Sequence, residues 1–158
     1  MTGVQTCALP ILFTGGLSVF INAVSIVQGN YYAAATGLLF GFTYLFVAFT
    51  KLQKLSPIPF AWFSTFVAIN AIICGTVEGI FGDTALNISP DWRWAVIWYL
   101  WAILWGSAFV EDICNKKLGN FVEDICNKKL GNFVPYLQIF EGIITAWIPG
   151  ILMLLNKW

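Results

Sequence analysis

The chain has 158 residues, of which 59% are apolar and only 10% are charged, and its formal net charge at pH 7 is zero. A soluble domain carries about 25% charged residues because its surface faces water, so this composition, with a mean hydropathy of +0.78, predicts a membrane protein. A neutral chain in which no basic run stands beside aromatic residues gives no reason to expect a nucleic acid partner.

The first eleven residues are set apart from the rest. Residues 1–11 read MTGVQTCALPI, and the part after Met1 resembles translated sequencing-adapter DNA. Segments of this kind are excluded from fold reasoning, as tags are. We therefore expect a non-native leader at 1–11 and a membrane channel domain at 12–158, with an unusual natural N-terminus as the alternative.

Apolar runs predict five transmembrane helices. Lipid offers backbone groups no hydrogen bonds, so spans are helical, and about 20 residues cross the hydrocarbon layer. The predicted spans are 12–27, 33–50, 60–77, 94–110 and 136–155. The expected fold is an all-α membrane bundle. Glu78, which follows the third span, is expected to be solvated.

The second predicted span carries two features. Gly37 and Gly41 form a small-xxx-small pair, which lets a neighbouring backbone approach closely. Phe40 and Tyr44 lie one turn apart on another face. Ordinary packing explains such a ring pair as well as a functional role does.

The fourth predicted span carries a row of tryptophans. Trp94, Trp98, Trp101 and Trp105 are spaced i, i+4, i+7 and i+11, which places them within an arc of about 60° on a helix. Tryptophan normally gathers at membrane interfaces, which accounts for Trp94 better than for Trp98 or Trp101. Helix packing and a stripe facing a permeation path are both open interpretations.

An identical stretch of twelve residues, FVEDICNKKLGN, stands at 109–120 and again at 121–132. Repeats that stack into an architecture recur at about 20–50 residues, so one copy of this tandem duplication is interpreted as surplus. Cys114 and Cys126 are then one position written twice. The cysteines show no metal or redox spacing, and we expect no metal and no cofactor.

Lysines predict the orientation of the bundle. Six of them lie in the loops after the second and fourth spans: Lys51, Lys54, Lys116, Lys117, Lys128 and Lys129. Because basic loops remain in the cytoplasm, we expect these loops, the duplication included, on the cytoplasmic side. The C-terminus is expected in the periplasm of a bacterial inner membrane.

Glu141 lies about 9 Å along the fifth span by helical rise. An ionisable group inside a membrane span is by default a functional hypothesis. The alternative is a carboxylate near the cytoplasmic interface that pairs with a loop lysine.

Four separated stretches resemble the UreI/AmiS family of bacterial urea channels and short-chain amide transporters. They are ATGLLFGFTYLF (35–46), WFSTFVAINAI (62–72), WRWAVIWYLWAILW (92–105) and LGNFVPYLQIFEGIITAWIP (130–149). The resemblance implies six helices and one pore per protomer, in a hexameric ring. The five helices would then remain from a six-helix fold whose first helix is missing.

The resemblance also implies the residues that line the pore. They match Phe40, Tyr44, Trp98, Trp101, Leu104, Trp105 and Glu141. Indole N–H groups and the Tyr44 hydroxyl are expected to meet the solute carbonyl, while Glu141 accepts from its amide N–H groups.

We therefore expect a passive, aromatic-lined channel for urea or short-chain amides, surrounded by lipid. Acid-gated members of the family carry histidines in long outer loops, whereas this chain has no histidine, so acid gating is not expected. A structural or assembly subunit without transport activity is the alternative. An enzyme is not expected, because no hydroxyl–base pair accompanies Glu141.

Overall fold

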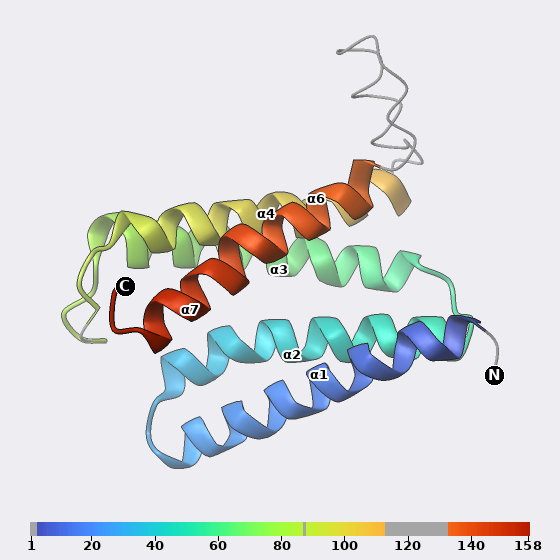
Figure 1. The fold of residues 1–158 in the computed structure, drawn as a ribbon, viewed down its shortest axis with the longest axis horizontal. Helices are drawn as coiled ribbons and strands as arrows, with labels where there is room; N and C mark the ends of the chain where they lie inside the picture. Colours follow the sequence, from blue (N-terminus) through green and yellow to red (C-terminus); the bar gives the residue numbers. More distant parts are fainter. Residues whose placement is uncertain (1–2, 87, 113–132) are drawn as a thin grey trace, which may run out of the picture. The chain divides into compact units, whose positions relative to one another are not determined.

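The computed structural model describes residues 3–86, 88–112 and 133–158, and these residues are helical apart from short connections. The elements, in chain order, are α1 (Gly3–Val27), α2 (Tyr31–Leu52), α3 (Ile58–Thr76), the π-helical turn η1 (Val77–Phe81), α4 (Trp92–Asp112), α6 (Phe133–Glu141), the π-helical turn η2 (Gly142–Trp147) and α7 (Ile148–Leu154) (Figure 1). The prediction of an all-α fold is confirmed. The chain divides into two compact units, Met1–Ser64 and Thr65–Trp158, which are described separately.

Four helical segments are long and apolar enough to cross a membrane. They are Ala8–Val27, Tyr31–Leu52, Ile58–Phe81 and Trp92–Val110. The fifth predicted span is also present, but its apolar part, Ile139–Leu154, is shorter. Its helix begins earlier, at Phe133, so the chain enters the apolar stretch already helical.

Two predicted boundaries were wrong. α1 begins at Gly3 rather than at residue 12, because the residues before Leu12 carry no charge that would end an apolar helix. The interpretation of 1–11 as a non-native leader is not tested by this continuity and stays a prediction. The third span continues through η1 to Phe81, so Glu78 lies inside the helical segment and is half-buried instead of solvated.

The first unit is built on a hairpin of α1 and α2, which run side by side (Figure 1). A Cβ added to Gly37 would lie 2.1 Å from Asn22 Oδ1, and one added to Gly41 would lie 2.9 Å from Val19 Cγ2. The expectation that this glycine pair admits a neighbouring helix is confirmed. Ser18 Oγ donates across the interface to the Gly37 carbonyl at 3.4 Å.

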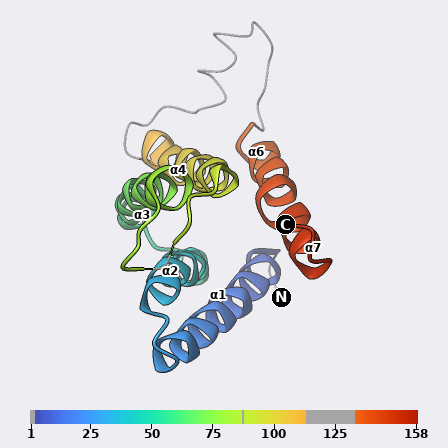
Figure 2. The same cartoon turned by 90° about the vertical axis from the view of Figure 1, so that its left-hand side faces the viewer.

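The second unit contains a similar close approach of two helices, at a glycine pair that sequence analysis did not single out. A Cβ on Gly75 would lie 2.8 Å from Trp98 Cβ, and one on Gly79 would lie 2.2 Å from Ala95 Cβ. The two glycines are four residues apart, so they share one helical face. The end of α3 and η1 therefore lie directly against the start of α4, as both views show (Figure 2).

The C-terminal residue Trp158, which follows α7, packs on the start of α4 within the same unit. The Trp158 ring lies 5.8 Å from the Trp94 ring, and the Arg93 guanidinium carbon lies 4.6 Å from the Trp158 ring centroid. Arg93 Nε donates to both carboxylate oxygens of Asp91 at 2.9 Å. Near this end of α4, the backbone N–H of Asp91 donates to the Glu78 carbonyl at 2.9 Å.

The duplicated stretch lies mostly outside the described residues. α4 ends at Asp112, so the first four residues of the first copy complete that helix. Residues 113–132, which include four of the six lysines expected on the cytoplasmic side, are not among those described.

Candidate functional site

Three of the four tryptophans form a continuous row along α4. The Trp98 and Trp101 ring centroids are 5.2 Å apart with an interplanar angle of 87°, and those of Trp101 and Trp105 are 6.2 Å apart at 63°. Edge-to-face geometry of this kind is favoured by the ring quadrupoles. Trp94 is not part of the row, because it packs on Trp158 near the start of α4.

The row faces protein rather than lipid. Trp98 is 4% exposed and Trp105 is 7% exposed, while Trp101 and Leu104 are half-buried. By contrast, Val96 and Ile103, on the same helix, are 44% and 59% exposed. Apart from Trp92, the first residue of α4, which is 72% exposed, the large apolar side chains that α4 exposes are therefore aliphatic, and the tryptophan row is turned inward.

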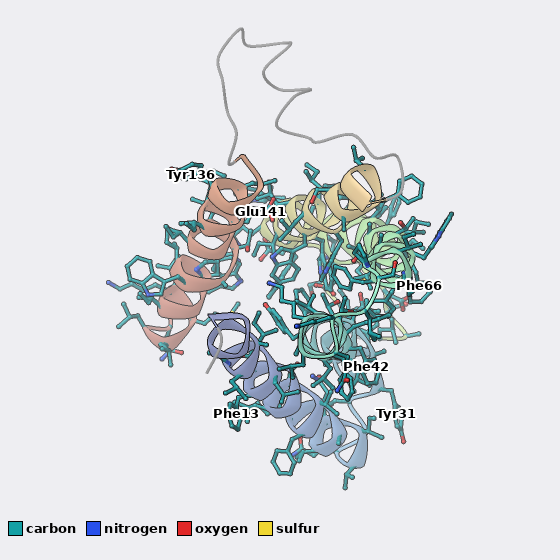
Figure 3. All side chains as sticks on the ribbon, turned by 90° about the vertical axis from the view of Figure 1, so that its right-hand side faces the viewer. Phe13, Tyr31, Phe42, Phe66, Tyr136 and Glu141 are labelled. Carbon is teal, nitrogen blue, oxygen red and sulfur yellow. The ribbon has the colours of Figure 1, made fainter. Side chains whose placement is uncertain are left out.

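Glu141 lies at the end of α6, on the side of that helix that faces α4 (Figure 3). It is 1% exposed, and neither carboxyl oxygen has a hydrogen-bond partner among the residues that the structure describes. A buried carboxyl group without a donor is costly. The arrangement therefore leaves two acceptor oxygens that a bound donor can satisfy. The lysines between α4 and α6, with which the alternative interpretation could pair Glu141, lie outside the described part of the chain.

Thr145 connects the tryptophan row to the helix that carries Glu141, and sequence analysis missed it. Trp101 Nε1 donates to Thr145 Oγ1 at 2.8 Å, and Thr145 Oγ1 donates to the Glu141 carbonyl at 2.6 Å. Thr145 is 4% exposed. Its spacing of four residues from Glu141 in an apolar span is the signal that could have found it, because i and i+4 share a helix face.

The hydrogen bond to Thr145 corrects one detail of the expected site. The Trp101 indole N–H is the only donor of its ring, and here it is used by the protein. It is therefore not offered to a solute carbonyl, as was expected of the indole groups. Trp101 presents ring surface instead.

Phe40 and Tyr44 lie one turn apart on α2, in the first unit. Phe40 is half-buried, and Tyr44 is 39% exposed. The structure thus brings together Trp98, Trp101, Trp105 and, through Thr145, the Glu141 turn. The meeting of Phe40 and Tyr44 with that group stays a prediction.

Among the described residues, no group of three or more cysteine, aspartate or glutamate side chains could hold a metal ion. The ion pair that the structure records joins Arg93 to Asp91 at the start of α4. The site around Trp101 and Glu141 therefore consists of ring surfaces, one hydroxyl and one carboxyl group.

The sequence matches the profile described as AmiS/UreI family transporter over residues 2–157. It is 36% identical to the acid-activated urea channel of Helicobacter pylori (strain J99 / ATCC 700824), covering 98% of this chain and 86% of that protein. It is also 36% identical to a putative amidate substrates transporter protein of Mycolicibacterium smegmatis, covering 92% of this chain and 62% of that protein.

Solved structures of a urea channel have a similar fold. The structure is similar to that of the Helicobacter pylori urea channel in its closed state, with a TM-score of 0.80 and 36% identity over 98% of this chain and 86% of that one. A crystal structure of the urea channel from the same organism gives a TM-score of 0.74 at 37% identity, with the same coverage of both chains.

These relatives are channels and transporters, which confirms the expectation that the chain is not an enzyme. With its long apolar helices, it is a multi-pass protein of the inner membrane. The chain belongs to the AmiS/UreI family of transporters.

Proposed function

We propose that the protein is a passive channel for urea or short-chain amides, whose path is lined by aromatic rings and by Glu141. The observation that carries the proposal is the buried carboxyl group of Glu141, which has no donor among the described residues and stands one turn from the partner of Trp101. The relatives named for urea and for amidates support this solute class.

Urea and small amides are planar, neutral and rich in N–H donors. A narrow aromatic passage strips water from such a solute and offers flat ring faces to it. Each amide N–H left unpaired in an apolar passage costs on the order of a few kcal/mol, so a buried acceptor is required. Glu141 supplies two acceptor oxygens. In this proposal the Tyr44 hydroxyl, on α2, donates to the solute carbonyl.

Ions are excluded by the same passage. Removal of water from a charged solute costs far more than removal from a neutral one, and apolar constrictions exclude ions by losing their water. The sequence carries no nucleotide-binding motif. Flow along the concentration gradient is the mechanism that these features support.

Acid gating is not part of the proposal, although one relative is an acid-activated channel. Histidine is the side chain whose charge changes near pH 6, and the chain contains none. The connection between α1 and α2 is also short, because α1 ends at Val27 and α2 begins at Tyr31. No long outer loop stands there to carry a pH switch.

The proposed assembly is a homohexamer in lipid, with one path in each protomer and the C-terminus in the periplasm. The orientation rests on Lys51 in the last turn of α2, on Lys54 after that helix and on the lysines between α4 and α6.

Stopped-flow light scattering on liposomes that contain the purified protein tests the proposal. We expect urea and acetamide to enter faster than into protein-free liposomes, while sodium chloride does not. A structural or assembly subunit gives no solute flux above that of the lipid alone, and that result would remove the channel function.

A further inference from the structure

We propose that Thr145 is a positioning residue: its hydroxyl fixes the Trp101 indole in the middle of the tryptophan row and removes the indole N–H from the solute's reach. This inference rests on the proposed channel function. It adds a residue to the path that acts through another side chain, and it assigns Trp101 a role as ring surface rather than as hydrogen-bond donor.

The direction of each hydrogen bond is fixed by the chemistry of the groups. An indole N–H only donates, so Thr145 Oγ1 accepts from Trp101 Nε1 at 2.8 Å. A backbone carbonyl only accepts, so the Thr145 hydroxyl proton goes to the Glu141 carbonyl at 2.6 Å. The hydroxyl therefore has its single proton committed and one of its acceptor positions filled.

Trp101 is the ring whose orientation matters most in the row. Its centroid lies 5.2 Å from that of Trp98 and 6.2 Å from that of Trp105, so it contacts a ring on either side. Rotation of the Trp101 indole would break both edge-to-face contacts. One hydrogen bond from the neighbouring helical segment thus fixes the ring that both of the others contact.

The backbone around Thr145 places its hydroxyl on the buried face. Glu141, Thr145 and Pro149 are buried at intervals of four residues, while Ile143, Ile144 and Trp147 between them are exposed. Thr145 lies in the π-helical turn η2. Such turns are rare and occur frequently at functional sites. The face that carries the Glu141 carboxyl group therefore also carries the acceptor for Trp101.

This bond has a consequence for solute selection. With the Trp101 N–H occupied, the solute meets the face or edge of that ring, and Glu141 provides the acceptor oxygens. Selection at Trp101 then depends on flatness and width of the solute, and not on a carbonyl acceptor. Loss of the bond would free a donor and let the ring turn.

The test compares Thr145→Val, which has the same shape but no hydroxyl, with Thr145→Ser, which keeps the hydroxyl. The matched control is Thr14→Val, because Thr14 is exposed and its hydroxyl donates to its own helix, at Pro10 O, 2.9 Å away. Two quantities are measured on the full chain: urea flux in liposomes, and the indole N–H resonance Raman band. The Trp101 band is identified by difference from Trp101→Phe, since the chain has 8 tryptophans.

We expect Thr145→Val to shift the Trp101 band to that of a free indole and to lower urea flux about fivefold, the effect of one net hydrogen bond. Thr145→Ser should restore both, and Thr14→Val should change neither. In the double variant Thr145→Val, Trp101→Phe, the two losses of urea flux should not add, because each change removes the same hydrogen bond between these residues.

The proposal is overturned if the Trp101 band in Thr145→Val equals that of the wild type, or if the band shifts while urea flux is unchanged. If Thr145→Val does not insert, Trp101→Phe decides alone, and wild-type urea flux in that variant overturns the proposal. A wild-type protein without flux is a different result: the proposed function fails, and the positioning role fails with it.

Discussion

Gly79 and Ala95 touch through their backbones, since a Cβ added to Gly79 would lie 2.2 Å from Ala95 Cβ and 2.7 Å from Ala95 Cα. No side-chain rotation can relieve such a contact, because the atoms belong to the α4 backbone and to its first side-chain carbon. The approach of η1 to α4 therefore depends on the absence of a side chain at position 79.

We expect Gly79→Ala to destabilise the protein by about 1–3 kcal/mol, the usual cost of forcing atoms into a packed interface. The measurement is thermal unfolding in detergent, followed by circular dichroism. Gly106→Ala is the matched control, because a Cβ there meets nothing within 4 Å and alanine favours a helix. Equal stability of the two variants would contradict the packing of η1 on α4.

The first unit should respond more mildly to the same change. A Cβ on Gly37 would meet the amide of Asn22, which is the end of a flexible side chain and can turn away. The turn would cost the hydrogen bond that Asn22 Nδ2 donates to the Ser18 carbonyl at 2.7 Å. We expect Gly37→Ala to cost about 1 kcal/mol, and Asn22→Ala in the same chain to recover part of the loss in unfolding experiments.

The cluster at the start of α4 predicts a stability change in acid. The hydrogen bond and charge of Arg93 lower the pKa of Asp91 below its usual value. A carboxyl group with a depressed pKa in the folded state stabilises the fold above its unfolded pKa and loses this contribution as pH falls through the folded value. The loss therefore begins below about pH 4.

Asp91→Asn removes this titration, so the variant should be less stable than the wild type at pH 6 and nearer to it at pH 3. The difference should not exceed about 1 kcal/mol, because the pair is only partly buried. Unfolding midpoints at the two pH values measure it. If the stability difference between the wild type and Asp91→Asn grew from pH 6 to pH 3, the charge of Asp91 would not be what stabilises the folded chain through Arg93.

The absence of histidine predicts that the channel conducts at neutral pH. Urea flux in liposomes at pH 7 should already exceed the lipid background, since no imidazole must be protonated first. A protein that is silent at pH 7 and conducts at pH 5 would contradict the ungated proposal and would place a switch on carboxyl groups. Urea flux measured at pH 7 and at pH 5 distinguishes the two outcomes.

Tyr44 provides a test of the contribution of α2. Tyr44→Phe keeps the ring and removes the hydroxyl that we propose meets the solute carbonyl. Urea flux should fall about threefold to tenfold, the value of a neutral hydrogen bond. The control is Tyr31→Phe, because Tyr31 is 69% exposed at the start of the same helix. Unchanged urea flux in Tyr44→Phe would show that the Tyr44 hydroxyl does not contact the solute.

The helices could be predicted because backbone groups in lipid must form their hydrogen bonds within the chain, and a helix does this within one segment. Runs without charge locate them, and the inward face of α4 follows from tryptophan spacing. Two of the helix ends were predicted wrongly. α1 starts at Gly3 because nothing in 3–11 stops an apolar helix, and the third span includes Glu78 because Gly79 packs on Ala95 beyond it.

The parts that sequence analysis missed depend on contacts between distant residues. Spacing placed Trp94 in the same row as Trp98, but the contact with Trp158 separates it. Thr145 is an ordinary residue in an apolar span until Trp101, 44 positions earlier, donates to it. Hydropathy and periodicity report which face is apolar, and they carry no information on which hydroxyl accepts from which indole.

Substitution of Glu141 tests the central claim most directly. Glu141→Leu replaces the carboxyl group by an apolar side chain and so removes both acceptor oxygens, while Trp147→Phe, on a residue 64% exposed, serves as the control. Urea flux in liposomes should fall at least about tenfold for Glu141→Leu, because amide N–H groups are then left unpaired, and should stay at the wild-type level for Trp147→Phe. Wild-type urea flux in a folded Glu141→Leu protein would show that the solute passes elsewhere.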